Sequence, residues 1–206
     1  KIRESLMKSQ LIKDKKIIEN DWFTSELAKV EEIVKMQAGK VVAFKLSGED
    51  YPSSEQVNKT TFPSTGKILL PLKVFIMHQE SLKERLAKKE IGIWLFTHEE
   101  IHKFIEILGD LNRFPLMAIH VGKFSDGRIF SIGNQLRNKY NFKNELRAIG
   151  DVLRDQIFFL KRSGFDSYLI RKDRDVKNAI KGLDDFSDPY QSGGDNLEPA
   201  WKRLKR

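Results

Sequence analysis

Charged side chains gather in three short segments in the second half of the chain. Each segment, at residues 122–128, 150–156 and 171–174, follows an apolar run and mixes Lys or Arg with Asp. That mixture suits two kinds of chemistry, because a cation can hold an anionic ligand and a carboxylate beside it can carry a proton. The three segments are therefore candidate parts of one binding or catalytic site.

Three cations in these segments are candidate contacts to an anion. They are Lys123, Arg128 and Arg154, which stand at or near the amino ends of expected helices, where backbone N–H groups also attract negative charge. Asp151 and Asp155 flank Arg154 within one helical turn and are the candidate proton carriers. The alternative stays open that the aspartates cap the helices and pair with the neighbouring arginines, which would leave no site.

The string His-Glu-Glu-Ile-His at 98–102 matches the short motif in which two histidines one turn apart bind zinc. Its surroundings do not fit that role, since Glu100 and Lys103 add charges where such helices are usually uncharged, and no third ligand has a diagnostic spacing. A helix start with Thr97 as its N-cap accounts for every residue of the string. We therefore expect no metal site.

The charged segments are positioned by a regular alternation of apolar runs and stretches of helical period. The expected strands are 68–72, 91–96, 116–121, 146–149 and 168–170, and the expected helices are 73–88, 98–110, 128–141, 151–163 and 173–184. Strands without polar alternation are covered on both faces, so the fold class is α/β. Successive βα units form a mainly parallel sheet, either doubly wound or curved like part of a barrel. Ligands bind such sheets beyond the carboxyl ends of the strands, where the charged segments begin.

The first third of the chain is less regular. Residues 11–18 are typical of two short strands around a polar turn, 25–37 of a helix, 41–46 of a strand and 47–67 of a long loop. The organisation we expect is an irregular N-terminal β/α extension over 1–67, a core of βα units over 68–190 and a basic tail over 191–206.

The composition of the 206-residue chain excludes several classes of protein. An apolar fraction of 40% is too high for a wholly disordered chain, and no stretch approaches the ~18 apolar residues of a membrane helix. The chain starts without an apolar signal-peptide core, so we expect a cytoplasmic protein. The absence of Cys excludes thiolate-bound clusters. A net charge of +8 favours anionic partners, but no nucleic-acid-binding motif accompanies it, which weakens the case for nucleic acid.

Three strings in the second half resemble a bacterial family. They are Phe-Ser-Asp-Gly-Arg at 124–128, Glu-Leu-Arg-Ala-Ile-Gly-Asp-Val-Leu-Arg-Asp-Gln at 145–156 and Arg-Ser-Gly-Phe-Asp at 162–166. The family is the one catalogued as domain of unknown function 934, whose members carry the label of an oxidoreductase of sulfite reduction. The resemblance covers most of residues 7–190. The label rests on genes that lie beside those of sulfite reductase.

The resemblance implies an accessory or redox-linked protein of assimilatory sulfite reduction, which binds a small anion or a phosphate-bearing cofactor such as a flavin. Its expected partner is sulfite reductase or another sulfate-assimilation protein, because a chain without Cys cannot ligate sirohaem or an iron–sulfur cluster through thiolates. The alternative from another class is a non-catalytic module that docks an acidic protein or RNA through its basic face.

The matching strings also carry site residues over to this chain. Beside the two aspartates and the cations above, they imply anion or cofactor contacts from Ser125, Asp126, Arg147 and Gln156. Two departures matter. Ser163 stands where the family often has Cys, so any thiol role is absent, and the segment 24–67 is longer than the family leads us to expect.

Overall fold

A computed structural model of the chain describes residues 10–29, 52–186 and 202. The expected strand at 41–46 and nearly all of the expected basic tail lie outside these residues. The strands are β1 (Gln10–Lys13), β2 (Lys16–Glu19), β3 (Phe23–Thr24), β4 (Ile68–Pro71), β5 (Ile91–Phe96), β6 (Leu116–Val121), β7 (Glu145–Gly150) and β8 (Ser167–Leu169). The helical segments are α1 (Ser54–Lys59), α2 (Leu72–His78), α3 (Lys83–Ala87), α4 (His102–Leu108), η2 (Leu111–Arg113), α5 (Arg128–Asn134), η3 (Gln135–Lys139), α6 (Arg154–Arg162), α7 (Val176–Ala179) and η4 (Ile180–Asp184).

The strands form one curled, mostly parallel sheet in the order β2-β1-β8-β7-β6-β5-β4-β3. All five strands expected in the core are present, and the predicted α/β class is confirmed. From β4 to β8 each strand lies beside the next one in the chain, whereas a doubly wound sheet reverses direction at a switch point. The fold is therefore the partial barrel, one of the two alternatives that the sequence left open. The short N-terminal strands β1, β2 and β3 belong to this same sheet.

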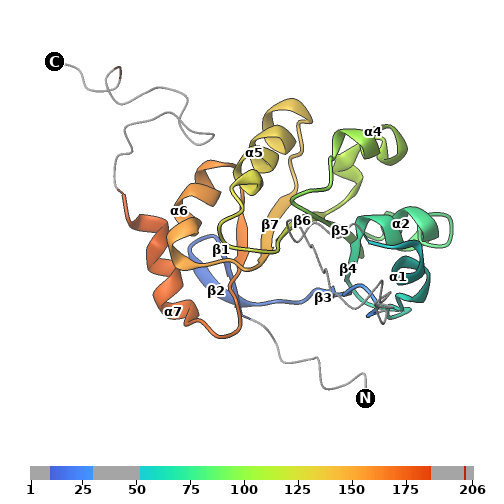
Figure 1. Ribbon diagram of the computed structural model, residues 1–206, viewed down its shortest axis with the longest axis horizontal. Helices are drawn as coiled ribbons and strands as arrows, with labels where there is room; N and C mark the ends of the chain where they lie inside the picture. Colours follow the sequence, from blue (N-terminus) through green and yellow to red (C-terminus); the bar gives the residue numbers. More distant parts are fainter. Residues whose placement is uncertain (1–9, 30–51, 187–201, 203–206) are drawn as a thin grey trace, which may run out of the picture.

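Helices cover the outer face of the curl, where α2, α4, α5, α6 and α7 follow one another in an arc (Figure 1). Because every crossover adds its strand on the same side and with the same hand, the helices all fall on one face. The main apolar core lies between these helices and the outward side chains of the strands, such as Ile93, Ile119 and Ala148. None of the helices in the described part of the chain is long and apolar enough to cross a membrane.

The link between β2 and β3 shows how strongly the sheet curls. These strands are the two edges of the sheet, yet only three residues, 20–22, connect Glu19 to Phe23. Four consecutive Cα–Cα steps span at most about 15 Å, whereas eight strands laid flat would separate their edges by about 34 Å. The edges must approach each other, so the connecting segment 20–22 closes the inside of the curl.

The inside of the curl is filled in layers, as in a complete barrel. Strand register places Leu69, Gly92, Leu116 and Glu145 in a lower layer, Trp94, Ala118, Arg147 and Ser167 in a middle layer, and Phe96, His120 and Ile149 in an upper layer. The upper layer is the one nearest the carboxyl ends of the parallel strands. Trp22 of the connecting segment packs against apolar members of all three layers.

Several helix boundaries differ from the expected ones for local reasons. The expected helix at 73–88 is split into α2 and α3, and the hydroxyl of Ser81 donates to the carbonyl of His78 at the break. The expected loop at 47–67 contains α1, which starts with a capping box of Ser53 and Gln56. Residues 25–29 are not helical, and the rest of the expected helix at 25–37 lies outside the described residues.

Three helices begin later than expected. The helices predicted to start at 151 and 173 start at Arg154 and Val176, with Leu153 and Asp175 as their N-caps. Helix α4 begins only at His102, because the preceding residues form a turn in which the carboxylate of Glu99 accepts the backbone N–H of Phe96. The expected helix end at Gly164 is confirmed, since Gly164 has the left-handed φ of 96° just past α6.

Candidate functional site

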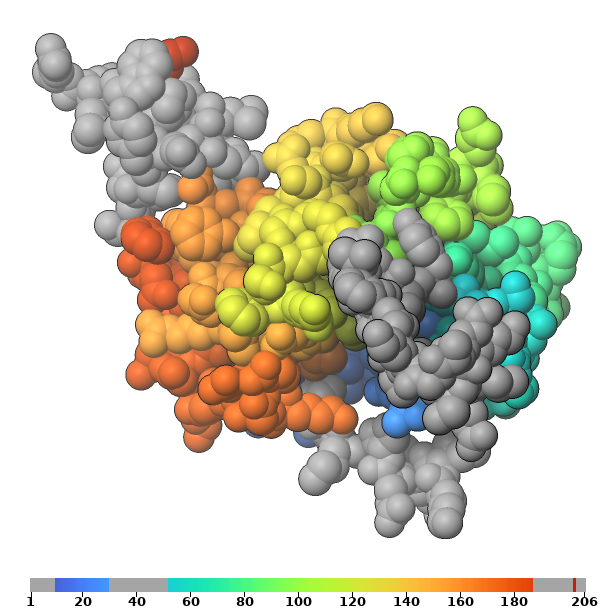
Figure 2. Space-filling view, viewed as in Figure 1, coloured from blue at the N-terminus to red at the C-terminus, as the bar shows by residue number. Residues whose placement is uncertain are grey.

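The loops at the carboxyl ends of the parallel strands form one edge of the sheet, which we call the rim. It comprises residues 97–101, 122–128, 150–156 and 170–175, which follow β5, β6, β7 and β8. Figure 2 shows the segments after β6, β7 and β8, coloured yellow to orange, beside one another on the face turned to the viewer. Every side chain that the sequence nominated for the site lies in the rim, with the exception of Arg147.

Asp151 joins three consecutive loops of the rim. One of its carboxylate oxygens accepts the backbone N–H of Phe124 at 2.9 Å, and the other accepts the guanidinium of Arg171 at 2.7 Å. Gly150, just before it, has a φ of 92°, and a Cβ there would come within 2.4 Å of the carbonyl oxygen of Val121. Only glycine fits this position, so the backbone turns tightly and directs the carboxylate of Asp151 across the loops.

Gln156 holds the same loop from a second side. Its side-chain amide donates to the carbonyl oxygen of Phe124 at 2.6 Å, and its amide oxygen accepts the backbone N–H of Leu153 at 3.1 Å. Both backbone groups of Phe124 are therefore bonded by side chains from the loop after β7. The side chains of Lys123 and Ser125, on either side of Phe124, lie exposed and make no hydrogen bond or ion pair within the described part of the chain.

A further bond joins the loops after β5 and β6. The hydroxyl of Thr97 donates to the carboxylate of Asp126, which also forms a bidentate pair with the guanidinium of Arg128 at 2.9 Å for each bond. The hydrogen bonds from Arg128, helped by the one from Thr97, lower the pKa of Asp126 to about 2 against the opposing effect of burial. Asp126 is therefore charged at neutral pH, and it offsets the charge of Arg128.

Arg154 also has an acidic partner. Its guanidinium lies 2.9 Å from a carboxylate oxygen of Asp185, beyond η4, and 3.4 Å from the amide oxygen of Asn178. Asp155, the second candidate proton carrier, lies exposed in the first turn of α6. The structure thus shows the pairing of aspartates with arginines that the sequence left open. The rim cations without such a partner among the described residues are Lys123, in the loop after β6, and Lys172, in the loop after β8.

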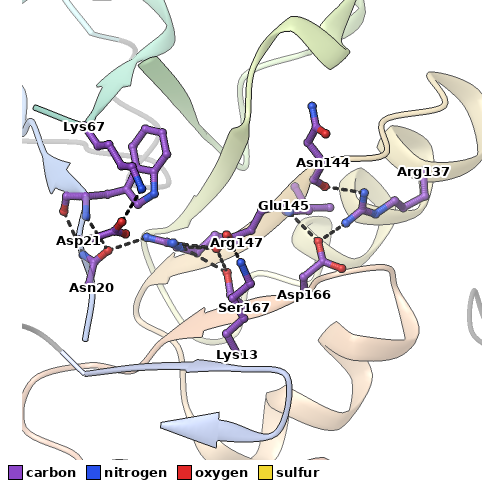
Figure 3. Close-up of polar contacts among 12 residues, drawn as sticks. Lys13, Asn20, Asp21, Lys67, Arg137, Asn144, Glu145, Arg147, Asp166 and Ser167 are labelled. Atoms are coloured by element: carbon purple, nitrogen blue, oxygen red, sulfur yellow. Dashed lines mark hydrogen bonds and ion pairs between the residues drawn. The ribbon is translucent and has the colours of Figure 1, made fainter. Parts of the chain in front are cut away.

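Arg147 lies apart from the rim, in the middle layer inside the curl, where it is 1% exposed. Figure 3 shows its guanidinium at the centre of a polar network that involves Glu145 at 2.7 Å, Ser167 at 3.2 Å and Asn20 at 2.8 Å. The ammonium of Lys13 completes the network at 2.7 Å from Glu145. Arg147 therefore anchors the connecting segment to the sheet.

The charge of Glu145 is maintained by these neighbours. Burial alone would raise its pKa, but the charge of Arg147 and the hydrogen bonds from Lys13 and Ser167 outweigh that effect and lower the pKa below its ordinary value. Glu145 therefore takes part in the network as a carboxylate.

Two other titratable groups with altered pKa values stand near the rim. Burial raises the pKa of Glu99, which is 3% exposed and whose carboxylate accepts the backbone N–H of Phe96 at 2.9 Å. Burial lowers the pKa of His120 in the upper layer, so its imidazole is neutral at neutral pH. Shifted pKa values at the carboxyl ends of parallel strands are typical of functional sites.

The histidines of the string at 98–102 turn to different partners. The ring of His98 stacks on Phe96 with centroids 5.2 Å apart, whereas His102 lies 3.3 Å from the carboxylate of Glu100. Within residues 10–29 and 52–186, no group of three or more His, Cys, Asp or Glu side chains is arranged to hold a metal ion. The donor set for a zinc site is therefore not assembled there.

A hollow of about 430 Å³ lies at the other end of the sheet. It is bordered by the β1–β2 turn, the end of α6 and the residues that lead into β8, including Lys15, Lys161 and Tyr168. None of the side chains nominated from the sequence borders it.

Sequence reasoning missed several residues that build the rim. Thr97 was expected to cap a helix, and Arg171 was noted in a charged segment but not nominated. Neither pairing could be predicted, because Thr97 and Asp126 are 29 positions apart and Arg171 and Asp151 are 20 apart. The signal available in the sequence was that Thr97 and Arg171 each stand just after a predicted strand.

Comparisons with known proteins give one match. A family model described as a bacterial protein of unknown function (DUF934) matches residues 92–201, which contain β6, β7, β8 and the whole rim. No curated protein and no solved structure matches the chain.

Proposed function

Because the chain belongs to the bacterial DUF934 family, a membership that assigns no activity, we propose its function from the geometry of the rim: it binds a small anion or a phosphate-bearing cofactor there. The observation that carries the proposal is the loop after β6. Lys123 and Ser125 offer an ammonium and a hydroxyl with no partner among the described residues, on a backbone that Asp151 and Gln156 fix on either side of Phe124.

Two features of this loop favour an anion over other ligands. Gly122 and Gly127 have open space above their α-carbons, so a ligand can approach the backbone closely. The arginines of the rim are already neutralised by aspartates, so Lys123 is the cation of this loop whose charge is available. A single ammonium with a hydroxyl beside it suits one phosphate or sulfur oxyanion better than the long backbone of a nucleic acid.

We infer further that this binding serves assimilatory sulfite reduction, as an accessory or redox-linked partner of sulfite reductase or of another sulfate-assimilation protein. The support is the family resemblance of the sequence. The absence of Cys means that the six-electron reduction itself would take place on the partner.

Anion binding can be measured by calorimetry on the full chain with sulfite, sulfate and inorganic phosphate. We expect saturable binding of at least one of them, weakened about tenfold by Lys123→Gln because one charge-assisted hydrogen bond is lost. Lys143→Gln is the matched control, since Lys143 is an exposed lysine at the opposite end of the sheet. Equal effects of the two substitutions, or no binding at all, would contradict the proposal.

The role in sulfite reduction is tested by deletion of the gene in its native host. Growth on sulfate should be impaired, and growth on cysteine should be normal. Equal growth on both would remove the metabolic part of the proposal. If instead a purified acidic protein or RNA bound with an affinity that falls steeply as salt rises, the docking alternative would take its place.

A further inference from the structure

An aromatic cluster lies inside the curl at the carboxyl ends of β5 and β6. The rings of Phe96 and His120 are cross-strand neighbours with centroids 5.1 Å apart, and Trp94 lies 4.9 Å and 5.4 Å from them. His98 stacks on Phe96 with only 12° between the ring planes. Trp94 is buried, whereas the other three rings are partly exposed. The cluster thus presents partly exposed ring surface at the end of the sheet where parallel strands bind ligands.

The imidazole of His120 adds a hydrogen-bonding group to this surface. Its Nδ1 atom is buried and has no hydrogen-bond partner within the described residues. Buried polar atoms in native proteins are nearly always bonded, so an unpaired one at this end of the sheet is a candidate for a bond from a ligand or an ordered water. The neutral imidazole has one donor nitrogen and one acceptor nitrogen. It can therefore form hydrogen bonds with the ring edge of an uncharged heterocycle.

The aromatic cluster is continuous with the candidate anion site. A Cβ on Gly150 would lie 3.1 Å from the Cε1 atom of His120, so the imidazole packs directly against the start of the loop after β7. The next residue, Asp151, binds the backbone N–H of Phe124. The ring of His120 and the loop that carries Lys123 thus both border the loop after β7.

We propose that the ligand of the rim carries a planar heterocycle as well as a phosphate, and that the heterocycle binds against Phe96 and His98 with a hydrogen bond to His120. The inference rests on the proposed function, in which Lys123 and Ser125 hold the phosphate. A flavin or purine nucleotide has the required chemistry, because each combines a flat ring, polar atoms on the ring edge and a terminal phosphate.

The test compares phosphates with and without a ring on the full chain. Flavin mononucleotide and adenosine monophosphate carry a ring, and ribose 5-phosphate does not. We expect at least one of the first two to bind about tenfold or more tightly than ribose 5-phosphate. We expect His120→Leu to lower the affinity for that nucleotide about tenfold and to leave ribose 5-phosphate unchanged, because only the ring contacts the imidazole.

Two further variants serve as controls for His120→Leu. His120→Asn retains a hydrogen-bonding side chain and should keep the nucleotide affinity within about threefold. His102→Leu removes an exposed histidine of α4 and should change nothing. Nitrogen-15 NMR of the unsubstituted protein reports on His120 directly, since its ring nitrogens should shift when the nucleotide is added but not when ribose 5-phosphate is added.

The outcomes separate this inference from the proposed function. Equal affinity for all three phosphates, an equal loss for all three in His120→Leu, or unchanged His120 resonances would overturn the ring site while anion binding stands. Riboflavin and adenosine, which lack the phosphate, test the reverse case. If riboflavin or adenosine binds and its binding depends on His120, while no phosphate binds, the anion site is contradicted and the ring site stands. If none of these compounds binds, both sites are overturned.

Discussion

The side-chain amide of Gln156 donates a 2.6 Å hydrogen bond to the carbonyl oxygen of Phe124, and thereby joins a residue that is 7% exposed to one that is 54% exposed. The carboxylate of Asp151 bonds the N–H of that same Phe124. A surface loop is rarely held so completely by the side chains of a single neighbour. Its geometry is therefore set before any ligand arrives, and a preorganised loop binds without the entropic cost of being ordered.

We predict that Gln156→Leu lowers the free energy of unfolding by about 1–3 kcal/mol, because it leaves the N–H of Leu153 and the carbonyl of Phe124 without their partner. Urea denaturation measures the change. Asp155→Asn, at the exposed neighbouring position, is the control and should change stability by less than about 0.5 kcal/mol. Similar values for both variants would show that the buried amide has no such role.

Substitution of Asp151 should separate its two contacts. In Asp151→Asn one amide oxygen can still accept the N–H of Phe124, but the amide nitrogen cannot accept from Arg171, so the loop after β8 should loosen alone. In Asp151→Ala both loops should loosen. Hydrogen exchange at the backbone amides of Phe124 and Arg171 measures this, with faster exchange at Arg171 in both variants. Loss of protection at Phe124 in Asp151→Asn would contradict the assignment.

The network around Arg147 gives a prediction about coupling. Arg147→Met should lower the free energy of unfolding by about 1.5–3 kcal/mol, since it leaves the carboxylate of Glu145 with only Lys13 and Ser167 as partners. The double variant Arg147→Met with Glu145→Leu should be more stable than Arg147→Met alone, because the partly buried carboxylate that has lost its guanidinium is then absent. Chemical denaturation of both variants measures the difference. If the second substitution brings a further loss, the pair is not the source of the cost.

Glu99 should make stability depend on pH. Its pKa in the folded protein is raised above the ordinary value of 4.5, so above pH 4.5 the folded state binds more protons than the unfolded state. Stability contributed by the neutral carboxyl is therefore present at pH 4.5 and below, and is lost as pH rises through the folded pKa. Glu99→Gln removes this loss. At pH 7.5 the variant should therefore have a higher melting temperature than the unsubstituted protein, and at pH 4.5 the two melting temperatures should differ little.

The control for this measurement is the adjacent Glu100→Gln, whose side chain is exposed and carries no burial penalty. Its melting temperature should follow that of the unsubstituted protein across the same pH range. If the two glutamine variants have the same profile, burial of Glu99 is not the cause.

The core of the fold could be predicted from the sequence, because apolar runs and their spacing record which strands are buried on both faces. The strands at 91–96 and 116–121 were found at their observed bounds for this reason. Helix starts were predicted less well, because a side chain such as Asp151 can equally cap its own helix or bond a neighbouring loop. That choice depends on what the fold brings beside it, which in this case is the backbone of Phe124 and the guanidinium of Arg171.

The place of Arg147 shows the other limit of sequence reasoning. Its string resembles a family motif that also contains residues of the rim, yet strand register puts its side chain inside the curl. The acid that pairs with Arg154, Asp185, lies 31 positions later in a part of the chain without strand periodicity. Local patterns therefore predicted which charged residues reach the rim loops, but not which of those charges would be neutralised there.

The pairing of β1 with β8 has a consequence for how the protein is made. Leu11 lies opposite Leu169, so β1 can join the parallel strands only after the chain as far as β8 has been made. Until then β1 can pair only with β2, and contacts between such distant parts of a sequence form slowly. We therefore expect the N-terminal hairpin to be the last part of the sheet to assemble, and the nascent chain to need protection from aggregation until it does.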